Sequence, residues 1–108
     1  MAWARIETGF RDHPKIVGLS DVAFRTWVLG LLYAVEHLTN GAVPRAVAYD
    51  RKAASELIAA GLWDTSDGGW QMHDFLEYQP SADQVRSQRE AARKRMARLR
   101  RDQAGRFD

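Results

Sequence analysis

The spacing of apolar residues changes within Leu57–Phe75, and each change marks the boundary of a predicted element. A helical pattern stops at Gly61, where a helix is expected to end in the left-handed conformation. Glycine adopts a positive φ at little cost, so it is the usual residue at such an end. Leu62 and Trp63 then begin an apolar run that is typical of a strand.

A β-hairpin is predicted immediately after this helix. Residues 64–69 are turn-forming, with Asp67-Gly68 as the hairpin turn and Gly69 as an expected bulge. Apolar Trp70 and Met72 then alternate with polar neighbours, as in a half-buried strand. The pattern therefore predicts a helix that leads directly into two short paired strands.

The strongest helical pattern covers Asp21–Leu38. Ser20 is a suitable N-cap, and Leu19 and Phe24 occupy the positions of a hydrophobic staple. Asn40-Gly41 is expected to end the helix. The apolar stripe is wide, which predicts a largely buried helix at the centre of the core. Its members are Phe24, Trp27, Val28, Leu31, Leu32, Val35 and Leu38.

Shorter elements are predicted around this helix. Asp50 is a plausible N-cap for a helix whose apolar face is Ala54, Leu57 and Ile58. Residues 74–78 are expected to run back across the body. The other expected elements are a strand over Ala2–Thr8, a helical turn from Pro14 to Gly18, an extended segment at Ala42–Pro44, and helices over Arg45–Tyr49 and Arg51–Ala60.

A second long helix is predicted after the break at Gln79-Pro80. Ser81 and Gln84 match a capping box, and the helix is expected to reach about Gln103 and to fray beyond it. Heptad positions d, d, a and d are occupied by Val85, Ala92, Met96 and Leu99, while Arg89 and Gln103 take the other a positions. This seam is thin for a coiled coil.

The elements together predict a mainly helical α+β fold. A helix followed directly by a hairpin is typical of the second half of a winged helix-turn-helix, with the hairpin as the wing. We expect this domain to cover residues 1–80 and a basic C-terminal helix with a frayed end to cover residues 81–108. The four tryptophans are expected to fill the core; they are Trp3, Trp27, Trp63 and Trp70.

The net charge of +2 conceals an asymmetry. Residues 1–80 hold 7 Lys and Arg against 10 Asp and Glu, a net charge of −3. Residues 81–108 hold 9 against 4, a net charge of +5. An acidic body with a basic tail favours a phosphate-rich partner for the tail. The absence of cysteine excludes disulfides and thiolate metal sites. No signal peptide or membrane span is recognised, so a cytoplasmic location is expected.

The helix over Arg51–Ala60 is the candidate recognition helix. We assign DNA binding in the body to Arg45, Arg51, Lys52 and Ser55, whose side chains suit phosphates or base edges. Glu56 opposes phosphate binding but is able to accept a hydrogen bond from cytosine. The alternative is a solvated charged face without a ligand. The expected wing holds Asp67 and no Lys or Arg, which favours a structural hairpin.

The C-terminal helix is the second candidate site. It is expected to bind phosphates, to pack on the body through its seam, or to associate with a second copy of the chain. A solvated helix that covers an apolar strip is the alternative, and a membrane surface is disfavoured by the weak apolar face. The candidate residues are Arg86, Arg89, Arg93, Lys94, Arg95, Arg98, Arg100 and Arg101.

Signals of an enzyme are absent from the sequence. His13, His37 and His73 lack the spacing of metal ligands, and His73 and Asp74 are taken as neighbours in sequence only. No phosphate-binding loop and no nucleophile elbow occur. We therefore expect a protein without catalytic residues, metal or cofactor.

Several blocks of the sequence resemble the N-terminal domains of phage and prophage replication-initiation proteins, the DnaD-like replisome-organiser type. The most telling block is H-D-F-L-E-Y-Q after A-G-L-W. The others are M-A-W-A-R-I-E-T-G-F-R-D-H-P-K-I, A-F-R-T-W-V-L-G-L, N-G-A-V-P-R-A and the arginine-rich R-E-A-A-R-K-R-M-A-R-L-R. The resemblance covers most of residues 1–100. It implies a winged helix that binds origin DNA or organises replication partners.

We therefore expect a protein that binds double-stranded DNA in phage or prophage replication initiation. A homodimer through the C-terminal helix and a replication protein as partner are further expectations. Two alternatives stay open at this point. One is a small phage transcriptional regulator, and the other is a protein–protein adaptor that does not bind DNA.

Overall fold

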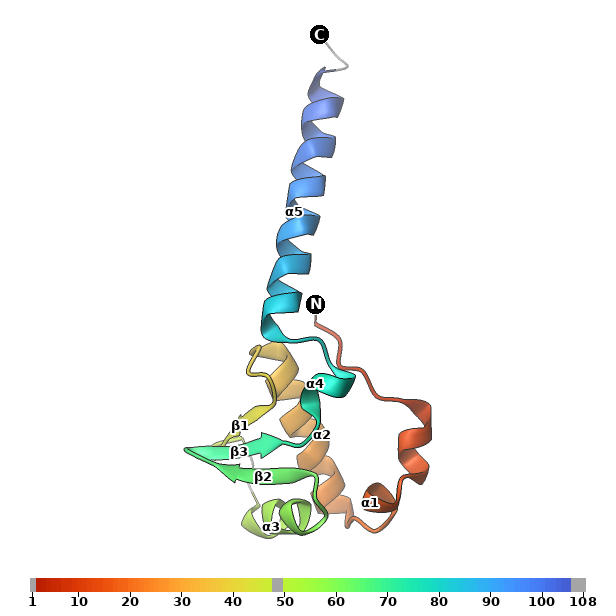
Figure 1. The fold of residues 1–108 in the computed structure, drawn as a ribbon, viewed down its shortest axis with the longest axis vertical. Helices are drawn as coiled ribbons and strands as arrows, with labels where there is room; N and C mark the ends of the chain where they lie inside the picture. The colour runs from red at the N-terminus through yellow and green to blue at the C-terminus, as the bar shows by residue number, and fades with distance from the viewer. Residues whose placement is uncertain (1, 48–49, 106–108) are drawn as a thin grey trace.

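The computed structural model describes residues 2–47 and 50–105, with side chains described as far as residue 102. A long helix rises from a small body, and the molecule extends over 65 × 31 × 20 Å (Figure 1). In chain order the elements are η1 (Thr8–Asp12), α1 (Pro14–Val17), α2 (Asp21–Glu36), β1 (Ala42–Pro44), α3 (Arg51–Ala59), β2 (Trp63–Ser66), β3 (Gly69–Met72), α4 (Phe75–Tyr78) and α5 (Ala82–Gly105).

The fold is mainly helical α+β with one small antiparallel sheet. The strand order is β1-β3-β2, so the hairpin strand β3 lies between its neighbours. Ser66 pairs with Gly69 around Asp67-Gly68, and Gly68 has a φ of 77°. The predicted bulge at Gly69 is wrong, because Gly69 pairs in register with both neighbouring strands. A side chain there would collide with the carbonyl of Val43 in β1.

The ends of α3 are set by local hydrogen bonds. The Asp50 carboxylate accepts from the backbone N–H groups of Lys52 (2.8 Å) and Ala53 (3.2 Å), which confirms the predicted N-cap. Gly61 has a φ of 77° and donates to the Ile58 carbonyl, while Leu62 donates to the Leu57 carbonyl. These two backbone hydrogen bonds form a Schellman motif, so the predicted glycine stop is confirmed.

Helix α2 buries part of the expected stripe: Trp27 and Leu31 are buried as predicted, and Val28 and Val35 pack against the core. Ser20 caps it as predicted, with its Oγ accepting from the Ala23 N–H. Phe24 and Leu32, which belong to the expected apolar stripe, are 42% and 49% exposed. The buried face is instead rich in small residues, because the sheet approaches closely there. Its members are Ala23, Trp27, Gly30, Leu31 and Ala34.

The centre of the core lies where Trp63 meets α2. Trp63 is 0% exposed, and a methyl group added to Gly30 would lie 2.7 Å from its ring. Trp70 stacks on Trp63 with ring centroids 5.5 Å apart. Trp3 is 79% exposed, so the prediction that all four tryptophans fill the core is wrong for this one. Trp3 lies in the N-terminal segment, where only a few residues reach the body.

The N-terminal segment is not a strand. Residues 2–7 pair with no strand of the described sheet, and Thr8–Asp12 forms the 3₁₀ helix η1. A side chain takes the place of a neighbouring strand: the Gln79 amide accepts from the Arg5 N–H at 2.9 Å and donates to the Arg5 carbonyl. Gln79 is 5% exposed and holds this segment against the end of α4.

The predicted helix over Arg45–Tyr49 is also wrong for its described part. Arg45–Val47 forms a turn in which the Val47 N–H donates to the Pro44 carbonyl, while residues 48–49 lie outside the described chain. α1, by contrast, begins with Pro14 and ends at Gly18 as predicted.

The capping box of α5 forms in full. The Ser81 N–H donates to the Gln84 Oε1 at 2.8 Å, and the Gln84 N–H donates to the Ser81 Oγ at 3.1 Å. The Asn40 Oδ1 accepts from the Ala82 N–H at 2.7 Å and fixes the start of α5 to the loop after α2. The helix continues to Gly105, and the expected frayed end lies largely outside the described residues. No described helix has the length and apolar character needed to cross a membrane.

Candidate nucleic-acid interface

A groove of about 440 Å³ lies between the start of α3 and the hairpin. Three of the four DNA-binding residues predicted in the body line it, namely Arg45, Arg51 and Ser55. Arg45 reaches it from the turn after β1, and Arg51 and Ser55 reach it from successive turns of α3. Lys52 is exposed on α3 but does not line the groove. The fold therefore brings together residues that the sequence separates.

The groove is suited to an anion. Its lining holds the guanidinium groups of Arg45 and Arg51 and no carboxylate. Arg51 also lies at the first position of α3, where the helix dipole favours negative charge. The Ser55 O–H donates to the Arg51 carbonyl at 3.0 Å, so in this structure it is not free to donate to an anion. The two arginines are therefore the candidate anion-binding residues of this groove.

The hairpin contributes the other wall of the groove. Thr65, Ser66 and Trp70 line it together with Gly69, although sequence reasoning assigned no function to them. Strand alternation could have indicated this wall of the groove, because Thr65 pairs directly with Trp70 across β2 and β3 and directly paired side chains lie on one face of a sheet. The lining therefore includes residues of both hairpin strands as well as the arginines. Asp67, at the tip of the hairpin, does not line the groove.

Glu56 has a structural partner in the fold. Its carboxylate accepts from the Ser20 N–H at 2.8 Å and from the Ser20 Oγ at 2.6 Å. Ser20 is the N-cap of α2, so Glu56 joins α3 to the start of α2. The Ser20 hydroxyl and N–H lower the pKa of Glu56 below its ordinary value of 4.5. The proposed acceptor for cytosine is thus already occupied.

Replacing Glu56 with glutamine is expected to lower the melting temperature at pH 7. Because the pKa is lowered in the folded state, the carboxylate stabilises the fold above pH 4.5, and this stabilisation is lost as the pH falls through the folded pKa. The difference between wild type and E56Q is therefore expected to shrink in acid. Thermal unfolding at a series of pH values measures it.

The control for this prediction is Asp64→Asn, which changes an exposed carboxylate on β2. This variant is expected to melt close to wild type at pH 7. A constant difference between E56Q and wild type from neutral to acidic pH would contradict the assignment, because only the ionised carboxylate makes both strong bonds to Ser20.

The basic residues of α5 lie far from the groove. α5 rises from one end of the body, whereas α3 lies at the other end (Figure 1). The structure therefore does not join the two predicted sets into one surface. All eight candidate cations of α5 are exposed. Two are near carboxylates, Arg86 with Asp83 at 3.6 Å and Lys94 with Glu90 at 3.5 Å, and pairs this exposed contribute little.

The histidines are the remaining residues to consider for metal binding or catalysis. His73 lies 3.0 Å from Asp74, Nδ1 to Oδ2, so the two are spatial partners and not neighbours in sequence only. Within the described residues, no group of three or more His, Asp or Glu is placed to hold a metal. The absence of catalysis and of cofactors stays a prediction.

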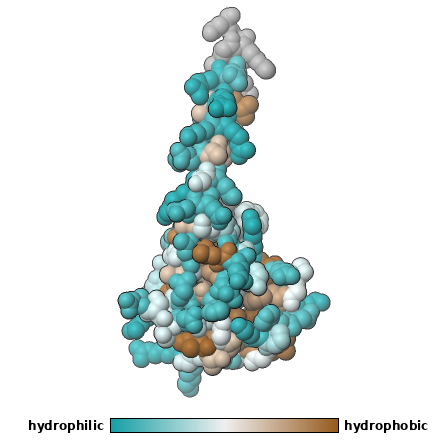
Figure 2. Space-filling model, in the orientation of Figure 1, coloured by the Kyte–Doolittle hydropathy of each residue, from teal (hydrophilic) through white to brown (hydrophobic). Residues whose placement is uncertain are grey.

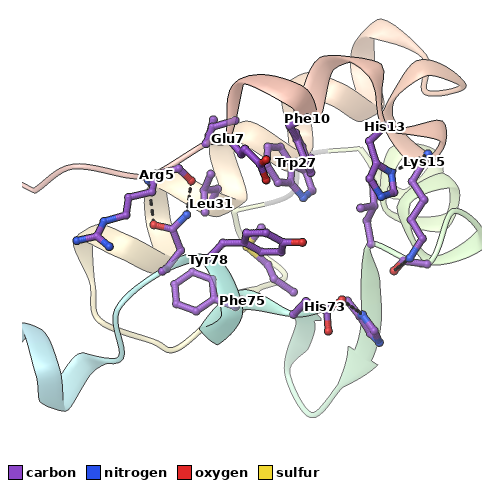
Figure 3. A pocket seen from close by; sticks show the side chains of 16 residues that line it. Arg5, Glu7, Phe10, His13, Lys15, Trp27, Leu31, His73, Phe75 and Tyr78 are labelled. Atoms are coloured by element: carbon purple, nitrogen blue, oxygen red, sulfur yellow. Dashed lines mark hydrogen bonds and ion pairs between the residues drawn. The ribbon is translucent and has the colours of Figure 1, made fainter.

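A second hollow, of about 90 Å³, lies between the N-terminal segment and the β3–α4 junction (Figure 3). Phe10 stacks on Trp27 at 4.8 Å along one side of it, and Phe75 and Tyr78 lie along another (Figure 3). Sequence reasoning missed this site, because its walls come from segments about 70 residues apart. Its rim carries both signs of charge, including Arg5, Lys15, Glu7 and Asp74.

Comparison of the chain with protein-family models, with curated proteins and with solved structures finds no match.

Proposed function

We propose that residues 1–80 form a winged helix that binds double-stranded DNA. The order of elements supports this proposal: α2, β1, α3 and then the β2–β3 hairpin, with β3 between β1 and β2. In this arrangement α3 is the recognition helix and the hairpin is the wing. The exposed face of α3, with Lys52 and Ser55, enters the major groove.

The observation that carries the proposal is the groove between α3 and the hairpin. One strand of the duplex runs along it, with Arg45 and Arg51 holding phosphates and the Thr65 and Ser66 hydroxyls adding hydrogen bonds. Contacts of this kind position a protein on the duplex and carry no sequence information. Base reading is left to α3, whose short exposed face limits it to a few contacts.

We assign this DNA binding to phage or prophage replication initiation. The support is the resemblance of several sequence blocks to replisome-organiser domains. Two of these blocks are in contact in the fold, because Gln79 at the end of one bonds the backbone of Arg5 in the other. The cations of α5 add phosphate affinity at a distance from the groove.

The groove is tested by the double variant R45A/R51A. Its affinity for a random duplex is expected to fall by about tenfold or more, and the slope of log affinity against log salt by about 2, since two phosphate contacts are lost. Fluorescence anisotropy across a salt series measures both quantities. The matched control R11A/R25A removes the same charge from exposed residues that do not line the groove.

Equal losses in R45A/R51A and in the control would contradict the groove as the DNA site. The replication role has its own test, which is selection of bound fragments from a phage genome. Bound fragments that map to a replication origin would support the proposal, whereas bound fragments that map to promoters would favour a transcriptional regulator. No retained fragment at low salt would favour an adaptor that does not bind DNA.

A further inference from the structure

Helix α5 carries an apolar seam that the body leaves uncovered. Val85, Ala92 and Leu99 recur every seven residues, and Met96 lies between the last two. This spacing is that of a coiled-coil seam. Met96 and Leu99 are 52% and 55% exposed, so no described part of the body covers them. Figure 2 shows a helix that is mostly hydrophilic and carries isolated hydrophobic spots.

The lower end of the seam opens into a hollow of about 330 Å³ at the base of α5. Val85 and Ala92 line it from α5, Val35 and Leu38 from the end of α2 and the residues after it, and Trp3 from the N-terminal segment. Val85 and Ala92 belong to both the seam and the hollow, so the seam leads down to the body, and Gln88 and Arg89 also line the hollow. A helix that lies along α5 would therefore meet the body at this hollow.

Charge is distributed unevenly around α5. The e and g positions and the polar a positions border the seam. Together they hold one carboxylate, Asp102, and five arginines, which are Arg86, Arg89, Arg93, Arg95 and Arg100. The outer face holds two carboxylates and three cations, the latter being Lys94, Arg98 and Arg101. A helix that served only to bind phosphates would not need its arginines beside an apolar seam.

These arginines disfavour a second copy of the chain as the occupant. In a parallel pair, Arg89 would face its own copy, and Arg95 at g would face Arg100 at e of the other helix. In an antiparallel pair, the e positions Arg86, Arg93 and Arg100 would face one another. Like charges at these positions select against a pairing, whereas opposite charges select for it.

We propose that α5 binds an amphipathic helix of a partner protein whose apolar seam is bordered by Glu or Asp. The apolar residues of the partner cover Met96 and Leu99 and extend into the hollow at Trp3. Its carboxylates pair with the arginines at the e and g positions. This interaction does not depend on DNA binding in the α3 groove, which lies at the other end of the body (Figure 1).

The test uses the full chain and a fluorescein-labelled synthetic peptide of three heptads. The peptide has Ile at a, Leu at d, Glu at e and g, and one central Glu at a to face Arg89. Anisotropy is expected to give a dissociation constant of about micromolar strength. A peptide with Lys in place of every Glu is expected not to bind, because its charges repel those of α5.

Two triple variants separate the seam from charge in general. R86E/R93E/R100E changes the border of the seam, and K94E/R98E/R101E makes the same change of charge on the outer face. The first is expected to weaken peptide binding by at least about tenfold and the second by less than about threefold, because pairs at e act directly across the interface. Circular dichroism checks that both variants keep their helix.

Three results would overturn the proposal. The first is the absence of binding by the Glu peptide at low salt, and the second is an equal loss in the two triple variants. The third is a stable dimer of the free chain in sedimentation that R86E/R93E/R100E leaves intact. A short random duplex distinguishes the DNA role, since both triples are expected to weaken its binding alike.

Discussion

Replacing Trp63 with alanine is expected to lower the free energy of unfolding by about 3–5 kcal/mol, the usual loss for a fully buried aromatic side chain. The Trp63 side chain is 0% exposed, meets Gly30 of α2 and stacks on Trp70. It therefore joins the sheet to the central helix. In a domain of this size such a loss removes a large share of the total stability. Urea unfolding followed by circular dichroism measures it.

The control at the same position is Trp63→Phe. The Trp63 Nε1 is buried without a hydrogen-bond partner, so phenylalanine removes an unsatisfied donor while keeping most of the apolar area. W63F is expected to lower the free energy of unfolding by clearly less than W63A does, because it leaves a smaller cavity and removes the unsatisfied donor. Equal losses in W63A and W63F would contradict this account, because the two variants remove very different amounts of apolar surface.

Replacing all eight cations of α5 by glutamine is expected to lower the salt dependence of duplex binding sharply. If about five of them contact phosphates, the slope of log affinity against log salt falls by about 4 to 5. These side chains are exposed and glutamine is a good helix former, so the fold is expected to persist. Anisotropy of a random duplex across a salt series measures the slope.

The matched control replaces the seven arginines among these cations with lysine. It keeps the charge of α5 and removes the planar guanidinium groups. If the phosphate contacts depend on charge alone, this control is expected to have a slope of log affinity against log salt close to that of wild type. A glutamine variant with the wild-type slope would instead show that α5 makes no contact with DNA, and its arginines would be left for the acidic helix proposed above.

Because α3 and α5 lie far apart, the two proposed interactions can take place on one molecule at the same time. The groove at α3 and the seam of α5 lie at opposite ends of a narrow molecule (Figure 1). A duplex that is held by the α3 groove alone leaves the seam accessible to a partner at the other end. The chain would then connect DNA to a second protein, which fits a role in the assembly of a replication complex.

Most element ends were predictable from the sequence, whereas the burial of α2 was predictable only in part. Phe24 and Leu32 form an apolar stripe at helical spacing, yet both are exposed. The face that meets the sheet carries Gly30 and Ala34, because the ring of Trp63 leaves no room for larger side chains. Periodicity detects large apolar residues, and it has no information about the shape of the surface that a helix meets.

The candidate site was predictable in part. Arg51 and Ser55 share one face of α3, which helical spacing alone places together. Their proximity to Arg45, Thr65 and Ser66 depends on the turn after β1 and on the pairing of β2 with β3. Glu56 was misassigned, because its partner Ser20 is 36 residues away and no local pattern joins the two.

The sequence by itself determined the starts of the three main helices, the end of α3 and the hairpin turn. The caps at Ser20, Asp50 and Ser81, the stop at Gly61 and the turn at Asp67-Gly68 are hydrogen bonds and backbone conformations between residues a few positions apart.

Only the tertiary structure decided which surfaces these elements share. It placed Arg5 against Gln79 instead of in a strand, tied Glu56 to Ser20, and formed one groove from α3 and the hairpin. It also left the seam of α5 uncovered beyond its first turns. The physical reason is range: a cap is completed by its neighbours in sequence, whereas burial and pairing depend on surfaces that only the folded chain brings together.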